Sequence, residues 1–463
     1  MKAQFETYVQ LAKCCVLREV AKQAFAGELH KNILDISKIN IPGREPTMRC
    51  CVYKEQAIFA ERAKLALGGD DNNPNVIEVI DIACDECPVG GYEITSMCRG
   101  CIAHRCKDVC KPGAIITDNK KRTYIDKSKC INCGLCEKAC PYNAIHNFKR
   151  PCEVACKVNA ISMKDTYEAH IDNEKCIACG ACVYQCPFGA IMDKSYIVDV
   201  IDLILESERK ADGKMYAIVA PSIASQFTYV KLGQVVSGIK ALGFNHVVEV
   251  AAGADLVAAA EAKELAEKGL LANSCCPAFA GYVKIQFPEL THYISHCLSP
   301  MAVIAKRIKE KDSDAKVVFI GPCTAKKVEW KQDNVRPYVD CVITFEELFA
   351  LLESKDINLT SLPEDELNDA TYFGRMFAVS GGLVGAVGES LRAQGFNDFE
   401  FKPVICNGIE ECRKALIKAS KNVLEENFIE GMACTGGCIG GAGCLRRSPK
   451  NRLEVEKFAN EVK

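Results

Sequence analysis

The sequence predicts a helical segment, then a cysteine-rich α+β region, then a large α/β domain with a largely parallel sheet. Three observations predict this order. Apolar residues recur at spacings of three and four before residue 80, as in amphipathic helices. Cysteine-containing units repeat between Cys84 and Cys186. Beyond residue 215, strand-like and helix-like segments alternate, which is typical of a parallel sheet covered by helices. The predicted boundaries are residues 1–83, 84–148, 149–195 and 196–463.

The composition restricts the function classes. A chain of 463 residues with 49% hydrophobic residues can fill at least one sizeable core. Its net charge of −2 gives no reason to expect binding to nucleic acid or to an anionic membrane. The N-terminus lacks the apolar core of a signal peptide, and no charge-free apolar run approaches the roughly 18 residues of a spanning helix. We therefore expect a cytoplasmic protein without membrane insertion, whose 30 cysteines are metal ligands rather than disulfides.

The first 83 residues are predicted to be helical. Apolar residues at 8–13 and 57–65 follow helical spacing, and Gly68-Gly69 ends the second run. Two adjacent cysteine pairs, Cys14-Cys15 and Cys50-Cys51, lie on or near these helices. We interpret both pairs as packed thiols, because free cysteine behaves as a small hydrophobe.

The cysteine-rich region contains four half units, in each of which an Ala-Ile pair follows a cysteine. Together they predict two tandem ferredoxin-like modules, residues 84–148 and 149–195. Two of the units carry the complete C-x-x-C-x-x-C-x-x-x-C-P run, which is strong evidence for binding of [4Fe–4S] clusters. These runs are Cys130, Cys133, Cys136, Cys140 and Cys176, Cys179, Cys182, Cys186.

The ligand sets follow from one rule: in two-cluster ferredoxins, the fourth cysteine of each run ligates the other cluster. The rule predicts three sets, which are Cys130, Cys133, Cys136 with Cys110; Cys98, Cys101, Cys106 with Cys140; and Cys176, Cys179, Cys182 with Cys156. Regular spacing would put His104 in place of Cys106. We favour Cys106, since its four-residue step to Cys110 matches the other runs.

A fourth cluster would need two ligands besides Cys152 and Cys186. Cys84 and Cys87 form the nearest unassigned C-x-x-C, and adding them gives four clusters from sixteen cysteines. Two alternatives stay open: Cys84 and Cys87 are structural, or Cys152 and Cys186 bind nothing.

The α/β domain should collect its ligands at one edge. An amphipathic stretch at residues 196–206 is predicted to be a connecting helix. Strand-like segments at 215–220, 246–251 and 315–320 alternate with helical patterns such as 257–268. Pro221-Ser222 and Cys323 each follow a strand, and ligands of parallel sheets gather beyond the carboxyl ends of the strands.

Three further cysteine stretches point to metal chemistry. Residues 274–279 read Ser-Cys-Cys-Pro-Ala-Phe, and residues 321–329 begin Gly-Pro-Cys-Thr-Ala-Lys. Residues 430–443 contain Cys434, Cys438 and six glycines, which predicts close approach of backbone to a bulky inorganic group. With Cys276 and Cys323, these cysteines supply the four thiolates that a [4Fe–4S] cube requires.

These stretches resemble the signature segments of the iron-only ([FeFe]) hydrogenases, T-S-C-C-P-x-W, M-P-C-x-x-K-x-x-E and E-x-M-A-C-x-x-G-C-x-x-G-G-G. The resemblance spans roughly residues 215–448. It departs from the pattern in a way that is similar to the clostridial "group B" branch. The departing residues are Asn273 for Thr, Phe279 for Trp, Gly321 for Met, Ala442 for the middle Gly and Cys444 for the usual Gln.

The resemblance implies an H-cluster, in which a [4Fe–4S] cube is joined to a two-iron subsite carrying carbon monoxide, cyanide and a dithiolate. Cys276, Cys323, Cys434 and Cys438 would hold the cube, and Cys438 would bridge to the two irons. Lys326 would donate to a cyanide, where a charge-assisted hydrogen bond is worth about 1.5–3 kcal/mol. The other positions that line the subsite in the family are Pro221, Ser222 and Met432.

The resemblance also implies a proton relay and a reaction, 2H⁺ + 2e⁻ ⇌ H₂. Cys275 would be the last donor, since a thiol has an adjustable pKa. Glu261, Glu264 and Ser295 match the two glutamates and the serine of the family relay, and the glutamates lie three apart on one helix face. Electrons would come from a ferredoxin or similar small carrier through the accessory clusters, and maturation proteins would install the two-iron unit.

Three alternative functions are open. Hydrogenase-like proteins of iron–sulfur assembly keep the cluster cysteines without a two-iron subsite, but Cys275, Lys326 and Met432 together argue against this function. A hydrogen sensor usually carries an added sensory domain. A protein that only transfers electrons would explain residues 84–191 but not the glycine-rich stretch.

Overall fold

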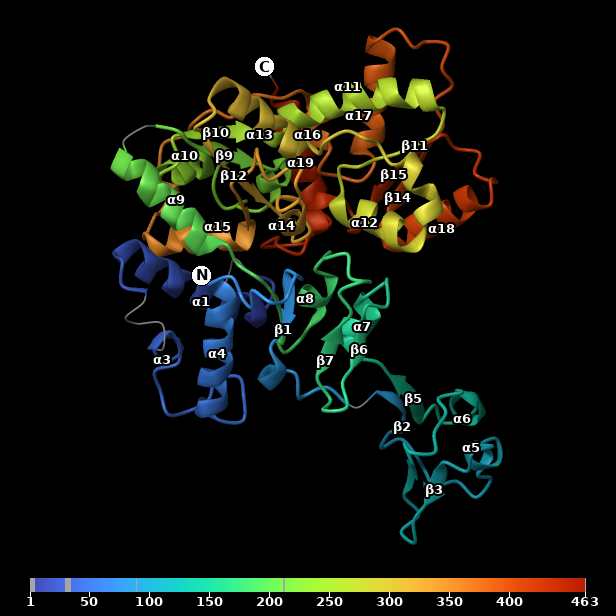
Figure 1. The fold of residues 1–463 in the computed structure, drawn as a ribbon. Coiled ribbons are helices and arrows are strands. Elements are labelled where there is room, and N and C mark those ends of the chain that lie inside the picture. Colours follow the sequence, from blue (N-terminus) through green and yellow to red (C-terminus); the bar gives the residue numbers. More distant parts are fainter. Residues whose placement is uncertain (1–4, 30–34, 89, 211–212, 463) are drawn as a thin grey trace.

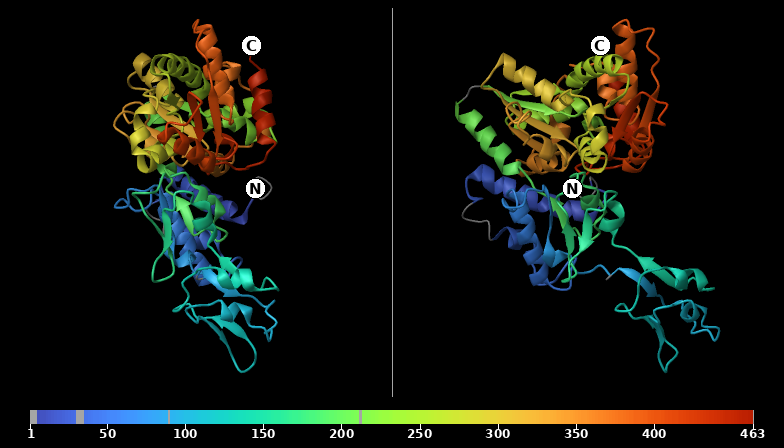
Figure 2. Two further views of the ribbon diagram at one scale, coloured as in Figure 1. Left: turned by 90° about the vertical axis from the view of Figure 1, so that its right-hand side faces the viewer. Right: turned by 45° about the vertical axis from the view of Figure 1, so that its right-hand side comes forward.

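The computed structural model describes residues 5–29, 35–88, 90–210 and 213–462. A broad α/β body lies at one end, the N-terminal helices and the second module lie against it, and the first module extends away as an arm (Figure 1 and Figure 2). This arrangement confirms the predicted fold class, an α/β domain preceded by ferredoxin-like modules and a helical segment. No helix in the described ranges is long and apolar enough to cross a membrane.

The N-terminal segment consists of α1 (Tyr8–Ala26), α3 (Ile36–Asn40) and α4 (Val52–Ala66). The Thr7 side chain caps α1 by accepting a hydrogen bond from the Gln10 amide, and Gly27 ends the helix in the left-handed conformation. The packed-thiol prediction is correct for Cys14, which is buried. It is wrong for Cys50, which is exposed because it lies in the loop before α4.

The modules are built from short antiparallel strand pairs and single-turn helices. The pairs are β2 (Gly91–Ile94) with β5 (Ile145–Phe148), β3 (Ile115–Thr117) with β4 (Thr123–Ile125), β6 (Ile161–Met163) with β7 (Ala169–Ile171), and β1 (Ile77–Val79) with β8 (Ile191–Asp193). The helices are α5 (Arg105–Asp108), α6 (Leu135–Ala139), α7 (Pro151–Ala155) and α8 (Ala181–Gln185). Because β1 precedes the modules in sequence, the β1–β8 pair joins the N-terminal segment to the second module.

The α/β body contains two parallel sheets. The first has the order β10-β9-β12-β13 and the second the order β11-β15-β14. Their strands are β9 (Met215–Val219), β10 (His246–Glu249), β12 (Lys316–Gly321), β13 (Cys341–Thr344), β11 (Leu271–Ala272), β14 (Pro403–Asn407) and β15 (Phe428–Met432). The strand predicted to reach Ala251 stops at Glu249, because α11 begins at Val250.

Helices cover both sheets. They are α9 (Ile197–Lys210), α10 (Leu232–Leu242), α11 (Val250–Lys268), α12 (Pro277–Gln286), α13 (Pro300–Lys311), α14 (Lys326–Glu329), α15 (Phe345–Ser354), α16 (Tyr372–Met376), α17 (Gly382–Ala393), α18 (Ile409–Ser420) and α19 (Asn451–Asn460). The 3₁₀ turns are η3 (Asp81–Ala83), η4 (Pro221–Ser225), η5 (Pro288–Tyr293), η6 (Leu359–Ser361) and η7 (Cys438–Gly440). One core joins α1, α9 and α15 to the first sheet, and another joins the second module to the second sheet.

A buried network of charges connects three parts of the chain. Lys13 of α1 lies 2.5 Å from Asp193 of β8 and 2.7 Å from Glu346 of α15. Lys327 of α14 lies 2.8 Å from the other oxygen of Asp193 and 2.7 Å from Glu347. The network therefore fixes the second module and α1 against the body, next to the strand ends that carry the candidate site.

Candidate metal centre

The carboxyl ends of strands from both sheets surround one small cavity. Pro221 and Ser222 open η4 just after β9, and Cys323 follows β12 by two residues. On the other side, Cys275 and Cys276 lie between β11 and α12, and β15 ends at Met432. The prediction that one crevice collects these residues is met, since all of them line the same cavity.

The cavity has a volume of about 90 Å³ and a mainly apolar wall. The thiol, ammonium and hydroxyl groups in its wall belong to Cys275, Cys276, Cys323, Cys438, Lys326 and Ser222. Cys434 does not line it but lies close by. Burial first, and then the neighbouring charges of Cys323, Cys276, Cys179 and Cys438, raise the pKa of Cys434 well above its usual value. The four predicted cube ligands are therefore neighbours.

The glycine-rich stretch brings chain segments together. A Cβ at Gly440 would lie 2.3 Å from the Thr435 carbonyl oxygen, and one at Gly441 would lie 2.4 Å from the Pro322 carbonyl oxygen. We expected the glycines to admit an inorganic group to the backbone. At these two positions the nearest atoms are instead other backbone atoms, so the glycines position Cys434 and Cys438 by close chain packing.

Within the described part of the chain, two buried polar atoms in the cavity wall have no hydrogen-bond partner of good geometry. They are the Lys326 Nζ and the Ser222 Oγ. Lys326 forms an ion pair with Glu329 at 2.5 Å, but no hydrogen bond of good geometry. Burial alone would lower the pKa of Lys326; the charges of Glu329, Cys323 and Cys275 outweigh it and raise the pKa. Unpaired donors in an apolar wall suit a group that carries acceptor ligands, such as cyanide or carbonyl. The residues therefore fit the implied two-iron unit.

A chain of acid and hydroxyl groups leads away from Cys275. Glu261 on α11 is fully buried and accepts from the Ser274 amide at 3.4 Å. The Ser295 hydroxyl donates to Glu264 at 2.8 Å, and it lies near enough to Glu261 to lower the pKa of that carboxyl. Lys268 forms an ion pair with Glu264 at 2.7 Å. The structure thus brings together all four residues predicted for the proton relay.

Burial sets the protonation of the inner groups. It raises the pKa of Glu261 to about 8, although hydrogen bonds from Ser274 and Ser295 oppose the shift. Burial likewise raises the pKa of Cys275 well above its usual value. Both groups therefore hold protons near neutral pH, as a donor to a buried site must.

The second module places one cysteine set beside this cavity. The charges of Cys176 and Cys156 act on Cys179, and so does that of Cys323. Cys182 interacts with the same set and with Cys152. The predicted set of Cys156, Cys176, Cys179 and Cys182 therefore lies between the candidate cube and the remaining cysteines.

Cys84 and Cys87 lie with Cys152 and Cys186. The charge of Cys186 acts on the other three thiols, whose pKa values are raised first by burial. The Ala169 amide donates to Cys84 at 3.3 Å. The fourth cysteine of each half unit also receives an amide hydrogen bond from the alanine four residues on. These bonds are Ala114 to Cys110 at 3.2 Å, Ala144 to Cys140 at 3.4 Å, Ala160 to Cys156 at 3.2 Å and Ala190 to Cys186 at 3.3 Å.

The first module groups the remaining cysteines in two sets. Cys98, Cys101 and Cys140 act on the pKa of Cys106, after the larger effect of burial. Cys130 and Cys110 act in the same way on Cys136, and Cys133, which lies between Cys130 and Cys136 in sequence, is exposed. Among the described residues, no three His, Cys, Asp or Glu side chains converge closely enough to hold a single metal ion.

Sequence reasoning missed three residues of the site. Asn273 donates to the Cys275 sulfur at 3.1 Å and accepts from the Gly431 amide at 2.6 Å. Glu329 pairs with Lys326, and Cys297 contacts the relay through Glu264 at 3.8 Å. Asn273 and Glu329 belong to the quoted motifs, so their part in the site could have been predicted from the sequence. Cys297 had no motif to mark it.

The fold and the thiol sets define an iron–sulfur protein, and comparisons with known proteins identify the family. Residues 213–442 match the model "Iron only hydrogenase large subunit, C-terminal domain", and residues 123–146 and 169–192 match "4Fe-4S binding domain". Residues 213–442 are therefore similar to this hydrogenase domain, and the chain is a hydrogenase-like iron–sulfur protein.

The curated relatives include hydrogenases and an assembly factor. "Iron hydrogenase 1" of Clostridium pasteurianum is 27% identical, over 75% of this chain and 69% of the relative. "NADP-reducing hydrogenase subunit HndD" of Solidesulfovibrio fructosivorans is 28% identical, over 46% of this chain and 45% of the relative, so less than half of that protein is spanned. "Cytosolic Fe-S cluster assembly factor NAR1" of Eremothecium gossypii is 26% identical, over 56% of this chain and 74% of the relative. A solved [FeFe]-hydrogenase is 21% identical with a TM-score of 0.46, covering 56% of this chain and 88% of that one.

Proposed function

We propose that the protein is an [FeFe] hydrogenase that catalyses 2H⁺ + 2e⁻ ⇌ H₂. Cys276, Cys323, Cys434 and Cys438 would hold the cube of an H-cluster. When bound, the two-iron unit would supply the site at which protons and electrons combine. One observation carries the proposal. A buried thiol, Cys275, and a buried ammonium, Lys326, face the same apolar cavity, and acid and hydroxyl groups that could form a relay lie behind the thiol.

The chain's own residues would bind the cofactor and deliver protons. Lys326 and Ser222 would donate to the ligands of the two-iron unit, and Pro221 and Met432 would exclude water. Protons would pass from Glu264 through Ser295 and Glu261 to Cys275. A positioned acid–base relay typically contributes about 10²–10⁴-fold to rate.

Electrons would reach the cube through four accessory [4Fe–4S] clusters. The set that includes Cys179 would be the last of them, because the charge of Cys323 acts on Cys179 and the charge of Cys179 acts on Cys434. The first module, residues 84–148, contains ten Lys or Arg and seven Asp or Glu, a net side-chain charge of +3. It also exposes Ile102 and Ile131 inside its two cysteine runs. We propose that a ferredoxin or similar small acidic carrier docks on this arm.

The second candidate is an assembly protein without a two-iron unit, which the relative from Eremothecium gossypii favours. The two functions differ in what the cavity holds. An assembly protein needs the cysteine ligands but neither Cys275 as a donor nor a relay behind it.

Infrared spectroscopy tests the proposal. The full chain is produced with and without the maturation proteins that install two-iron units, and both samples are loaded with iron and sulfide. We expect carbon monoxide and cyanide stretches, together with H₂ evolution, only in the matured sample. Cys276→Ser is the matched control, because it removes a cube ligand and should abolish both signals. A matured, iron-replete protein without these stretches would favour the assembly function.

A further inference from the structure

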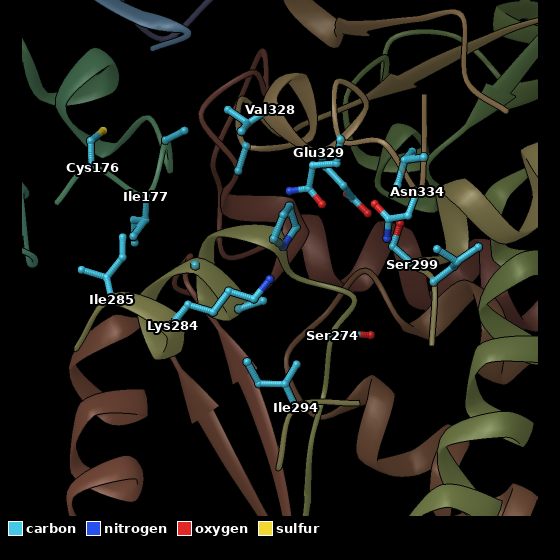
Figure 3. A pocket seen from close by; sticks show the side chains of 18 of the residues that line it. Cys176, Ile177, Ser274, Lys284, Ile285, Ile294, Ser299, Val328, Glu329 and Asn334 are labelled. Atoms are coloured by element: carbon cyan, nitrogen blue, oxygen red, sulfur yellow. The ribbon is translucent and has the colours of Figure 1, made fainter. Parts of the chain in front are cut away.

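A second, larger cleft lies behind the wall that carries Cys275. Its volume is about 380 Å³, and it lies where the second module meets the α/β body. Figure 3 shows Cys176 and Ile177 of the module on one side, with Ser299, Glu329 and Asn334 of the body gathered on another. Ser295 and Cys297 also line it, so the cleft reaches the proton relay.

Cys297 connects this cleft to the relay by three contacts. Its sulfur lies 3.8 Å from the Glu264 Oε2, which is hydrogen-bonding range for a thiol. Its amide donates to the Ser295 hydroxyl oxygen at 3.2 Å. Its carbonyl oxygen accepts from the Ser274 hydroxyl at 2.7 Å. The thiol is thus held between the cleft and the outer carboxylate of the relay.

At rest the sulfur carries a proton and the facing carboxylate oxygen carries none. Burial and the carboxylates of Glu261 and Glu264 raise the pKa of Cys297 to about 11, so the group is a neutral thiol with a proton to give. Burial alone would raise the pKa of Glu264. Lys268, Ser295 and the His296 amide outweigh it and lower the pKa, so Glu264 is an ionised acceptor.

We infer that Cys297 is the outer proton donor of the relay and that it takes protons from water in the cleft. This inference rests on the proposed hydrogenase function. In one concerted step, a hydronium ion in the cleft gives a proton to the Cys297 sulfur and leaves as water, while the Cys297 S–H bond breaks and an O–H bond forms on Glu264. No free thiolate forms, because the raised pKa of Cys297 would make it costly. The relay would begin and end with a thiol, Cys297 at the cleft and Cys275 at the cavity.

A competing route runs directly from bulk solvent to Glu264. The Glu264 side chain is 14% exposed beside Lys268. Solvent at that face could protonate Glu264 without Cys297. The two routes differ in whether removal of the thiol proton slows the enzyme.

The test compares H₂ evolution by matured full-length variants, with rates expressed per infrared-detected H-cluster. We expect Cys297→Ala to lower the rate at least about tenfold and to raise the solvent deuterium isotope effect. The loss is set below the roughly 10²–10⁴-fold of a positioned acid–base group because Glu264 keeps its own exposed face. Cys297→Ser should recover most of the rate, because it restores a transferable proton. Cys297→Val, which fills the volume but has no proton to give, should behave like Cys297→Ala.

Ser299→Ala is the matched control. Ser299 lines the same cleft and makes no hydrogen bond through its Oγ, so its removal should leave both readouts unchanged. Wild-type rates and isotope effects in Cys297→Ala and Cys297→Val would overturn the inference and assign proton uptake to Glu264 directly. Absence of the infrared bands from the matured wild type would instead reject the proposed function.

Discussion

Replacing Lys327 tests whether the buried charge network holds the second module to the α/β body. The Lys327 side chain is 0% exposed. Its ammonium donates to Asp193 at 2.8 Å and to the Lys194 carbonyl oxygen at 2.7 Å, and pairs with Glu347 at 2.7 Å. Lys327→Met keeps a long apolar stem and removes only the charge and its donors. Asp193 would keep Lys13 as its cation, whereas Glu347 would keep none.

The magnitude follows from the loss of one cation among five buried charges. Three carboxylates and two ammonium groups give the network a charge of −1, which becomes −2 in the variant. Breaking a buried ion pair on one side costs about 3–5 kcal/mol, because the partner stays buried and uncompensated. Glu347 keeps hydrogen bonds from the Tyr196 and Thr344 amides, which favours the lower end of this range.

The assay is urea unfolding of the iron-loaded protein, followed by the fluorescence of Trp330. This residue is the single tryptophan of the chain, and its ring lies 5.6 Å from that of Tyr196 beside the network. With a urea dependence of about 1–3 kcal/mol per M, the local transition should move by about 1 M or more to lower urea. Absorbance of the iron–sulfur clusters monitors the module at the same time.

Lys331→Met is the matched control for this prediction. Lys331 lies over the rings of Tyr196 and Trp330, at 4.6 and 5.8 Å from their centroids. Loss of such a cation–π contact should cost about 1 kcal/mol or less. If Lys327→Met shifts the transition no further than Lys331→Met, the network does not anchor the module and the reasoning is refuted.

Three more predictions concern the metal sites and the relay. Replacing both Cys84 and Cys87 by Ser should remove about four irons per chain, one [4Fe–4S] cluster, by colorimetric analysis; unchanged iron would rule out the fourth set. Glu261→Gln should lower H₂ evolution about 10²-fold at constant infrared bands. Burial raises the pKa of Glu261 from 4.5 to about 8, so between these pH values the folded protein keeps a proton on Glu261 that the unfolded chain has lost. The free energy of unfolding therefore falls as pH rises from 4.5 to about 8. Glu261→Gln should lose this pH dependence in urea titrations. Lys107→Glu with Lys111→Glu should slow reduction of an acidic carrier at low salt and leave dye reduction unchanged; equal slowing of both would argue against docking on the first module.

The sequence predicts well those parts of the molecule that chemistry ties to spacing. A cube needs four thiolates, so Cys176, Cys179 and Cys182 could be paired with Cys156 before any coordinates were known. Strand ends collect ligands, so Pro221 and Cys323 could be placed at one crevice. The packing purpose of Gly441 could not be foreseen, because the backbone atom it avoids belongs to Pro322, which is distant in the sequence.

Other features depend on contacts that leave no local pattern. Cys297 has no ligand spacing and reads as one more packed thiol, yet the fold places it on Glu264, 33 residues away. Lys13 is a buried residue of α1, and the other side chains of this helix predict only an apolar face packed against the core. The partners Asp193 and Glu346 explain the charge of Lys13, and they follow 180 and 333 positions later in the sequence.

The distance in sequence between Lys13 and Glu346 means that the ribosome makes the two partners at different times. Ribosomes add about 5–20 residues per second, so roughly 20–70 s pass between synthesis of Lys13 and synthesis of Glu346. All sixteen module cysteines leave the ribosome within this interval. The module thiols are thus available for cluster insertion before Glu346 is made, when Lys13 has only Asp193 as a carboxylate partner.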